Sequence, residues 1–495
     1  MASKRPTAFI LGEPAGVIAE VPAGFRLVFP WTEPPSILSI QKLSLGVMPM
    51  LLRPFMSFGL ALFAIVAAIH TLRADDWPQW LGPRADATWT ESGIIKAFPK
   101  TGPVISWKAE VAGGFSGPAV VKGKVLVSDF VRSEGKVTND FNARDTNKGT
   151  ERLLCLDAET GDLLWKYEYP EEYKISYPAG PRCTPTVAAD LVYHLGAEGH
   201  LACLSLKDGK PVWKLNLKEA FQSKTPMWGF CSHPVIDGDN LYLIAGPEDG
   251  ALLCLEAQTG TLRWKTIQSK EPGYAPVVVI NHSGRKQIIA WTATSLNSVD
   301  PALGKVHWSL PLEPKYGMSI MAPRLSGDLL FASGISNTAM VAKLSADASG
   351  NPEASELWRG TTSNAVYCGN STPFVSGDTI FGCDCNTGAF RAVDLLSGSR
   401  LWETFKPTTG KRANHGTAFI VRNADLYYLF SETGHLIIAK LDAKGYKELS
   451  RAKVIEPTNS SYNRGIVWVH PAFADKAMFI RNDKEIVRVD LSVKP

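Results

Sequence analysis

The chain has 495 residues, of which 45% are hydrophobic and 20% are charged. This balance is typical of folded globular proteins and excludes an intrinsically disordered or collagen-like chain. A net charge of only +4 excludes the strongly basic surface of nucleic-acid-binding proteins. The 42 glycines and 33 prolines favour many turns and short strands over a helical bundle.

The N-terminal part indicates a targeting segment. An uncharged run of 15 residues, Phe55–Ile69, follows Arg53 and precedes a short polar stretch that ends at Ala74. This order is the pattern of a secretory signal peptide, and the run is short for a membrane span, which needs about 20 residues. We therefore expect an over-extended or disordered N-terminus at 1–47, a signal peptide or membrane anchor at 48–74, and a lead-in to the fold at 75–102.

A repeat that ends in tryptophan runs through the rest of the chain. Five segments align without gaps, and each has Gly four residues before Trp and Cys, Ser or Ala ten residues before it. The segments are 153–165, 201–213, 252–264, 296–308 and 390–402. The tryptophans are Trp107, Trp165, Trp213, Trp264, Trp308, Trp358 and Trp402, spaced 44 to 58 residues apart, and the glycines are Gly161, Gly209, Gly260, Gly304 and Gly398. Such self-similarity is the signature of a repeat architecture.

The units of this repeat predict a ring of sheets. Short apolar or alternating runs, broken by Gly, Asp and Asn, leave room in each unit for four strands with tight turns. Residues 486–492 have the early half of a repeat without Trp, whereas residues 104–107 have the Trp without the early half. We therefore predict an all-β, eight-bladed β-propeller of four-stranded antiparallel blades over residues 103–495. The N-terminal strand is expected to pair with the last blade and close the ring.

The repeat residues are expected to have packing roles. Gly supplies the positive φ that the turn between two outer strands requires. Trp lies flat between neighbouring blades, where it buries a large area, and the position ten residues earlier must be small because the next blade packs against it. These positions predict the fold and say little about function.

The pattern A-x-D-x-x-T-G-x-x-x-W resembles the tryptophan-docking motif of PQQ-like (pyrrolo-quinoline quinone) propellers, over residues 103–495. The opening DWPQWLGP, residues 76–83, is similar to the start of secreted PQQ-like repeat proteins. Two functional branches share the implied fold: quinoprotein dehydrogenases, and the BamB-type scaffold of outer-membrane β-barrel assembly. The resemblance leaves the choice between enzyme and scaffold to other residues.

Features of the dehydrogenase branch are missing from the sequence. Those enzymes carry a vicinal Cys-Cys disulfide, and the nearest pattern here is Cys383-Asp384-Cys385. No Cys-x-x-Cys-His segment for an attached haem is present. About 420 residues follow Ala74, which is nearer to the compact scaffold branch. We predict no cofactor and no metal, with PQQ and Ca²⁺ as the alternative.

The cysteines fall into two further groups. Cys155, Cys203 and Cys254 occupy the small position of the repeat, so a packing role is expected. Cys183 and Cys231 precede innermost strands, as does Cys368 in the sixth blade. Free buried thiols and a disulfide both remain open for this second group.

The segments that enter the innermost strand of each blade carry the candidate functional residues. In a propeller these loops converge on one end of the central channel, where aromatic, amide and cationic side chains form a concave binding site. The arginines favour an anionic or carbonyl-bearing ligand, although these side chains could equally hold channel water and loop backbone. The candidates are Arg182, Trp228, His233, Asn364, Asn370, Arg412, Asn414, His415, Arg464, Trp468 and His470.

We expect a secreted or periplasmic, non-enzymatic propeller that binds a protein partner or a small anionic or carbonyl ligand on one face. No catalytic residue and no nucleic-acid contact are predicted. Membrane contact is expected only if the N-terminal segment stays uncleaved, and the protein would then be anchored in the inner membrane and face the periplasm. The alternative is a PQQ-dependent alcohol or sugar dehydrogenase with a divergent site. A polar insertion at 134–150 is expected to form a loop or hairpin at the rim.

Overall fold

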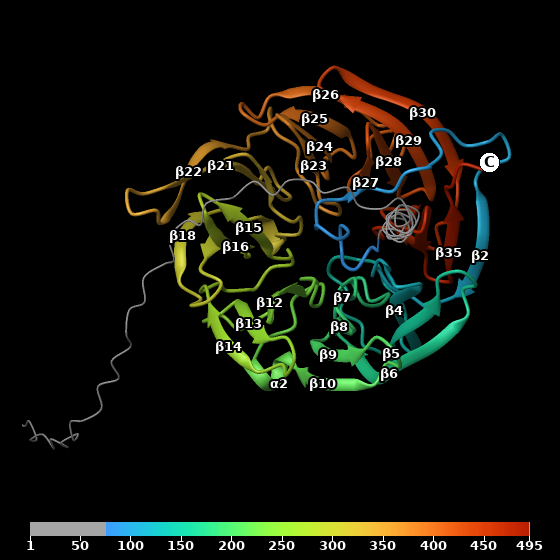
Figure 1. Cartoon of the computed structure of the whole chain (residues 1–495), viewed down its shortest axis with the longest axis horizontal. Coiled ribbons are helices and arrows are strands. Elements are labelled where there is room, and N and C mark those ends of the chain that lie inside the picture. Colours follow the sequence, from blue (N-terminus) through green and yellow to red (C-terminus); the bar gives the residue numbers. More distant parts are fainter. Residues whose placement is uncertain (1–75, 495) are drawn as a thin grey trace, which may run out of the picture. The chain divides into compact units, whose positions relative to one another are not determined.

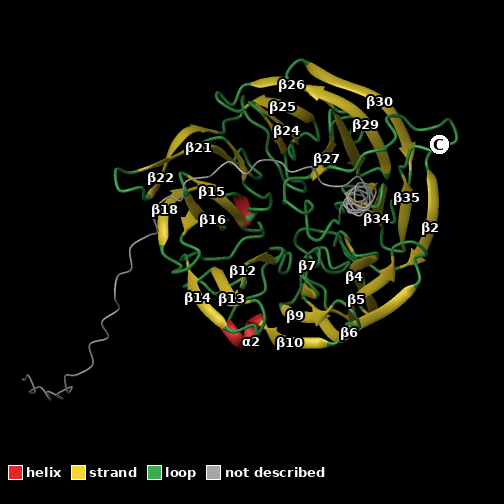
Figure 2. Ribbon diagram, in the orientation of Figure 1, coloured by secondary structure: helices red, strands yellow, loops and turns green. Residues whose placement is uncertain are grey.

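The computed structural model describes residues 76–494, so the expected signal peptide or anchor at 48–74 and the segment before it lie outside the described residues. The described chain forms eight antiparallel sheets arranged in a ring that follows the sequence (Figure 1). Almost all regular structure is β-strand (Figure 2). The predicted eight-bladed β-propeller is confirmed. Within residues 76–494, no helix has the length and apolar character needed to cross a membrane.

The first four blades follow one order, from the innermost strand outward. They consist of β3 (Ala119–Val121), β4 (Lys124–Glu134), β5 (Asn147–Asp157) and β6 (Leu163–Tyr173); β7 (Thr186–Ala188), β8 (Leu191–Leu195), β9 (His200–Ser205) and β10 (Pro211–Asn216); β11 (Val235–Asp237), β12 (Asn240–Ile244), β13 (Leu252–Glu256) and β14 (Leu262–Thr266); and β15 (Val278–His282), β16 (Arg285–Trp291), β17 (Ser295–Val299) and β18 (Val306–Pro311). Each hairpin joins neighbouring strands, so no blade contains a crossover.

The next blades repeat the pattern, and the last is completed by an N-terminal strand. They consist of β19 (Arg324–Ser326), β20 (Leu329–Ser333), β21 (Ala339–Ala346) and β22 (Pro352–Arg359); β23 (Phe374–Ser376), β24 (Thr379–Cys383), β25 (Phe390–Asp394) and β26 (Arg400–Thr404); β27 (Ala418–Asn423), β28 (Leu426–Ser431), β29 (His435–Asp442) and β30 (Gly445–Lys453); and β33 (Ala472–Ala474), β34 (Ala477–Arg481), β35 (Glu485–Asp490) and β2 (Val104–Glu110). Three elements lie in connections between blades: α2 (Leu217–Phe221), η1 (Lys315–Gly317) and the hairpin β31 (Asn459–Ser461) with β32 (Arg464–Ile466).

The ring closes as predicted, because β2 pairs antiparallel with β35 from Val104 opposite Asp490 to Glu110 opposite Glu485. The core lies between the blades. The middle strands β28 and β34 are buried along their whole length, whereas the outermost strand β6 alternates between exposed and half-buried positions. A strand covered on both faces needs apolar residues throughout, which explains the continuous apolar runs of the sequence.

The tryptophan of one blade packs on the glycine turn of the next. A Cβ at Gly260 would lie 2.8 Å from the Trp213 ring, and the Trp213 indole donates to the Ala257 carbonyl of that turn at 2.9 Å. The glycines have φ between 69° and 80°, a region that residues with a side chain enter only with strain. The same contact joins Gly161 to Trp107, Gly209 to Trp165, Gly304 to Trp264 and Gly398 to Trp358.

The small position of the repeat faces its own blade as well as the next one. Cys155 stands directly opposite Trp165 in the ladder, and Cys254 stands opposite Trp264. The side chain at this position is therefore limited in size by the facing tryptophan of its own blade, in addition to the neighbouring blade expected from the sequence.

Residues 76–89 run inside the channel, where Figure 1 shows the start of the described chain in blue. Trp77 exchanges two backbone hydrogen bonds with Val120 of the first blade, and the Val187 N–H of the second blade donates to the Pro78 carbonyl at 2.8 Å. The segment then forms β1 (Thr88–Trp89), which pairs in parallel with β27 of the seventh blade. The lead-in is therefore an internal part of the propeller.

Candidate functional site

A cavity of about 430 Å³ opens in the channel where the entry loops converge. This volume lies in the range of small-molecule sites, about 300–1,000 Å³. Of its 21 lining residues, 13 carry an aromatic or imidazole ring, and none is Asp or Glu. The cavity therefore offers flat apolar surfaces and carries no negative charge of its own.

Trp80, His233 and His470 form the floor cluster. The Trp80 indole stacks on the His233 imidazole, with ring centres 4.6 Å apart and planes 11° apart, and meets His470 edge-on at 6.0 Å. Trp80 belongs to the segment inside the channel and lines the cavity. Because that segment is joined to the innermost strands, the floor is fixed in position.

One wall comes from the first three blades. The Arg182 guanidinium lies 5.3 Å over the Phe115 ring and donates to the backbone carbonyls of Ser176, Tyr177 and Gly180. Trp228 and Tyr274 stand further along this wall, with their rings edge-to-face at 5.5 Å. Arg182 brings a fixed positive charge into an otherwise aromatic surface.

The opposite wall comes from the sixth to eighth blades. The His415 ring stacks on Tyr462 at 5.3 Å and lies 6.4 Å from Trp468. Behind it, the buried Glu432 accepts hydrogen bonds from the Arg464 Nε at 2.6 Å and from the Trp468 indole at 2.8 Å. This carboxylate fixes the wall and is already satisfied by the protein.

A lid lies over the mouth of the cavity. Phe141, from the loop between β4 and β5, lies 4.6 Å from the Tyr316 ring and 5.7 Å from Trp228. Asn139 of the same loop donates to the Asn459 side chain of the β31 hairpin at 2.6 Å. The polar insertion at 134–150 is thus the end of a hairpin that reaches across the channel mouth.

Four ring-bearing residues at the cavity have left-handed backbone. The φ angles are 55° at Tyr177, 61° at Tyr316, 56° at His415 and 50° at Tyr462. For residues with bulky side chains this conformation costs about 1–3 kcal/mol each, and such strain concentrates at functional sites. The loops are held in these conformations by the propeller, and each directs a ring into the cavity.

The cavity histidines are neutral at pH 7. Burial lowers the pKa of His470 to about 4 and that of His415 to about 4. Burial, together with the neighbouring His470, lowers the pKa of His233 to about 3. His233 Nδ1 accepts a hydrogen bond from the Thr184 N–H at 2.9 Å, so the neutral ring carries its proton on Nε2. These groups lack the pKa near 7 that a general acid or base needs.

The structure brings together seven of the residues predicted for the channel mouth and separates four others. The seven that line the cavity are Arg182, Trp228, His233, Asn370, His415, Trp468 and His470. Arg464 is held outside by Glu432, and Asn364 caps its own turn by accepting from the Thr361 N–H at 2.6 Å. Arg412 and Asn414 are exposed in the loop before β27. These four do not line the cavity, because position in an entry loop does not fix the direction of a side chain, and a ligand-binding role for any of the eleven stays a prediction.

Several cavity residues were missed by sequence reasoning. Tyr177 and Tyr316 stood in the entry loops but were not chosen, and their aromatic character was the available signal. Trp80 and Phe141 come from the lead-in and from the insertion. Their partners are far away in the sequence, so no local pattern could have indicated them.

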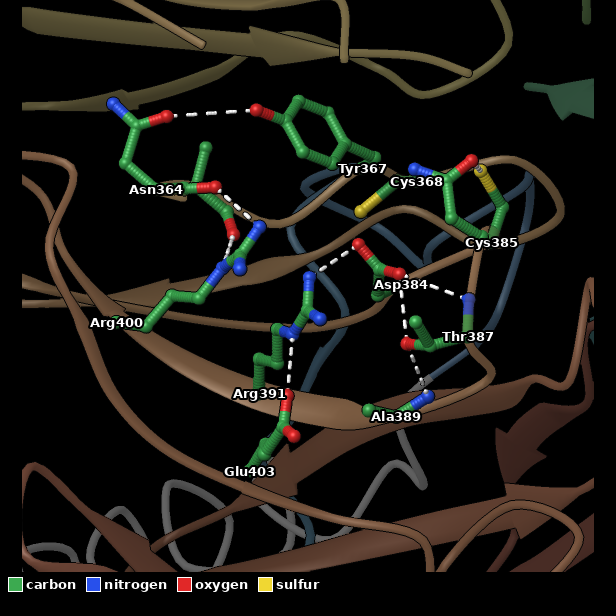
Figure 3. A network of polar contacts seen from close by, with 12 residues as sticks. Asn364, Tyr367, Cys368, Asp384, Cys385, Thr387, Ala389, Arg391, Arg400 and Glu403 are labelled. Atoms are coloured by element: carbon green, nitrogen blue, oxygen red, sulfur yellow. Dashed lines mark hydrogen bonds and ion pairs between the residues drawn. The ribbon is translucent and has the colours of Figure 1, made fainter. Parts of the chain in front are cut away.

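The Cys383-Asp384-Cys385 segment belongs to a structural network. Asp384, with a side chain only 1% exposed, accepts from Arg391 at 2.5 Å, and Arg391 also pairs with the more exposed Glu403 at 3.0 Å (Figure 3). All eight cysteines are free thiols in the described chain, and no group of three or more potential metal ligands occurs within residues 76–494. The network stabilises the sixth blade.

The cavity does not fit the donor set of PQQ with Ca²⁺. Calcium takes six to eight oxygen ligands, with carboxylates prominent among them, and no carboxylate lines this cavity. The nearby Glu432 is occupied by Arg464 and Trp468.

Comparisons with known proteins agree with the propeller fold. The family model described as outer membrane protein assembly factor BamB matches residues 149–404, slightly more than half of the chain. Outer membrane protein assembly factor BamB of Salmonella typhimurium is 25% identical over 143 residues, which span 27% of this chain and 32% of that protein. The chain thus matches only about a third of this relative's length.

A solved structure with a TM-score above 0.5 supports the propeller architecture. Quinohemoprotein alcohol dehydrogenase from Comamonas testosteroni has a TM-score of 0.54 at 12% identity, covering 85% of this chain and 81% of that one. BamB from Moraxella catarrhalis has a TM-score of 0.48 at 12% identity, covering 78% and 97%. At such identities the likeness concerns the fold alone.

The fold and the cavity define an eight-bladed propeller of the PQQ-like repeat class, with its central channel occupied by its own N-terminal segment. Within that class, the chain belongs to the family whose model is described as outer membrane protein assembly factor BamB.

Proposed function

We propose that this protein is a non-catalytic binding protein, secreted or periplasmic, that binds a small planar ligand in the cavity at its channel mouth. The observation that carries the proposal is a ring-lined cavity of about 430 Å³ with one fixed cation and no carboxylate. Apolar walls with a few directed polar groups are the usual character of a ligand site. Neutral histidines and the absence of a carboxylate leave no evident acid–base pair for catalysis.

A cavity-filling variant tests this proposal. Met318 lines the cavity, and Met318→Trp should block it, whereas Leu303→Trp adds the same ring in a turn where the side chain is 74% exposed. A panel of neutral and charged aromatic compounds is titrated while tryptophan fluorescence and melting temperature are recorded. We expect ligands that raise the melting temperature of the wild type and of Leu303→Trp but not of Met318→Trp. Equal responses of all three proteins would refute the cavity as the binding site.

An activity assay tests the dehydrogenase alternative. PQQ and Ca²⁺ are added together, and reduction of an electron-accepting dye is followed with alcohols and sugars. Because the cavity supplies no carboxylate for calcium, we expect no calcium-dependent reduction. Calcium-dependent turnover would refute the non-catalytic proposal.

The family match favours a second candidate function, that of a scaffold which binds a protein partner in outer-membrane protein assembly. The exposed Tyr316 at the cavity mouth would then contact the partner. Tyr316→Asp should reduce recovery of barrel-assembly components in a pull-down, whereas Leu303→Asp, in a blade turn, should not. Unchanged recovery with both variants would count against the mouth as a protein-binding surface.

A further inference from the structure

Arg182 has donor capacity that the protein does not use. A guanidinium carries five N–H donors, and three hydrogen bonds run from Arg182 to backbone carbonyls. The other residues that line the cavity include no Asp or Glu. A further contact runs from Arg182 to the Cys231 side chain, so at least one donor stays unused and the cation has no acidic partner in the cavity.

Tyr274, on the same wall, presents a second unused donor. Its side chain is buried, with the residue 3% exposed. Its O–H finds no acceptor in the described part of the chain, while the Trp228 backbone N–H approaches the hydroxyl oxygen as a donor. A buried O–H without an acceptor is unfavourable. Arg182 and Tyr274 both line this cavity, so the two donors face the same space.

The floor cluster adds a flat aromatic surface to the same cavity. Trp80 is held by its stacking on His233, and His233 carries its remaining proton on Nε2 because its Nδ1 accepts from Thr184. A planar ring of matching size would pack against the indole, since offset stacking of aromatic rings is favourable. The segment inside the channel is therefore a part of the site.

We propose that the cavity binds an aromatic monocarboxylate, with its carboxylate on Arg182 and the Tyr274 hydroxyl and its ring against Trp80. This inference rests on the proposed binding function and specifies the ligand class. One cation balances one carboxylate, whereas a polycarboxylate such as PQQ would bury negative charges without partners, which is strongly unfavourable.

The test is calorimetric titration of the full chain with a matched pair of probes, indole-3-carboxylate and indole-3-carboxamide, and with benzene-1,3,5-tricarboxylate. The monocarboxylate is expected to bind at least about tenfold more tightly than the amide, because a hydrogen bond to a charged group is stronger than one to a neutral group. The tricarboxylate is expected to bind more weakly than the monocarboxylate.

Three variants locate the contacts. Tyr274→Phe removes an O–H that has no acceptor in the described part of the chain, so the fold should be kept while affinity for the acid falls about tenfold and affinity for the amide is unchanged. Tyr428→Phe is the control: its hydroxyl donates to the Ile95 carbonyl at 2.6 Å, outside the cavity, and acid binding should not change. Trp80→Leu should weaken acid and amide together.

Equal affinity for the acid and the amide, or an unchanged acid affinity in Tyr274→Phe, would overturn the monocarboxylate proposal and leave the binding function in place. Absence of binding by every probe would also overturn it. The proposed binding function is refuted by a different result. It fails when the panel of aromatic compounds changes the melting temperature of the wild type and of Met318→Trp equally.

Discussion

Blade docking can be tested with two glycines that share a backbone conformation but differ in their surroundings. Gly260 has φ of 74° and Gly238 has φ of 58°. A Cβ at Gly260 would lie 2.8 to 3.1 Å from three atoms of the Trp213 ring, whereas a Cβ at Gly238 would meet nothing within 4 Å. Alanine at either position suffers the left-handed backbone penalty, and only Gly260→Ala also collides with the docked tryptophan.

The expected magnitudes follow from these contacts. The backbone penalty is about 1–2 kcal/mol for each variant. Carbon atoms prefer a separation of about 3.5–4.0 Å, so relief of the collision at Gly260 requires the indole or the turn to move, at a further cost of about 1–3 kcal/mol. The Trp213 indole would then lose part of its hydrogen bond to Ala257. We expect Gly260→Ala to lower the free energy of unfolding by at least about 1 kcal/mol more than Gly238→Ala.

Equilibrium denaturation in urea, followed by tryptophan fluorescence and by circular dichroism, measures this difference. Coincident transitions of the two probes justify a single free energy for each protein. Equal destabilisation by the two substitutions would show that backbone strain alone accounts for the cost of replacing Gly260. The requirement for glycine in indole docking would then be refuted.

Three further predictions concern titration, the buried ion pair and the thiols. Because burial lowers the pKa of His470 to about 4, the unfolded chain takes up a proton as pH falls below about 6.5 while the folded chain stays neutral. The free energy of unfolding therefore falls as pH drops from about 6.5 toward the folded-state pKa of about 4. In urea titrations between pH 7 and pH 5, the wild type should lose about 2 kcal/mol more of this free energy than His470→Gln. Parallel pH profiles of the two proteins would contradict this. Asp384→Asn should destabilise by about 3–5 kcal/mol because Arg391 then loses its buried carboxylate partner and keeps only the more exposed Glu403. Glu403→Gln, whose side chain is 52% exposed, should cost less than about 1 kcal/mol. Similar losses would show that burial of the pair is unimportant. Thiol titration in denaturant without reductant should detect all eight cysteines as free, and a value of six would reveal a disulfide such as one between Cys183 and Cys231.

The fold could be predicted in detail because its information is local and repeated. Most units carry their own glycine turn and tryptophan, and the incomplete units at the two ends of the repeat indicate the β2–β35 closure. The entry loops were also correctly placed at one mouth, since the order of strands in a propeller requires it. The orientation of side chains within those loops could not be predicted, as Asn364 and Arg464 show.

The sequence by itself determined the propeller, the number of blades and the way the ring closes, because periodic apolar strands and small residues opposite tryptophan permit few other arrangements. The tertiary structure alone decided the site. Trp80 meets His233 and Phe141 meets Tyr316 only because the ring brings segments distant in the sequence together inside the channel. The tertiary structure also decided which arginine is available to a ligand. Glu432 neutralises Arg464, whereas Arg182 faces a cavity without a carboxylate. Neither fact can be read from the spacing of residues along the chain.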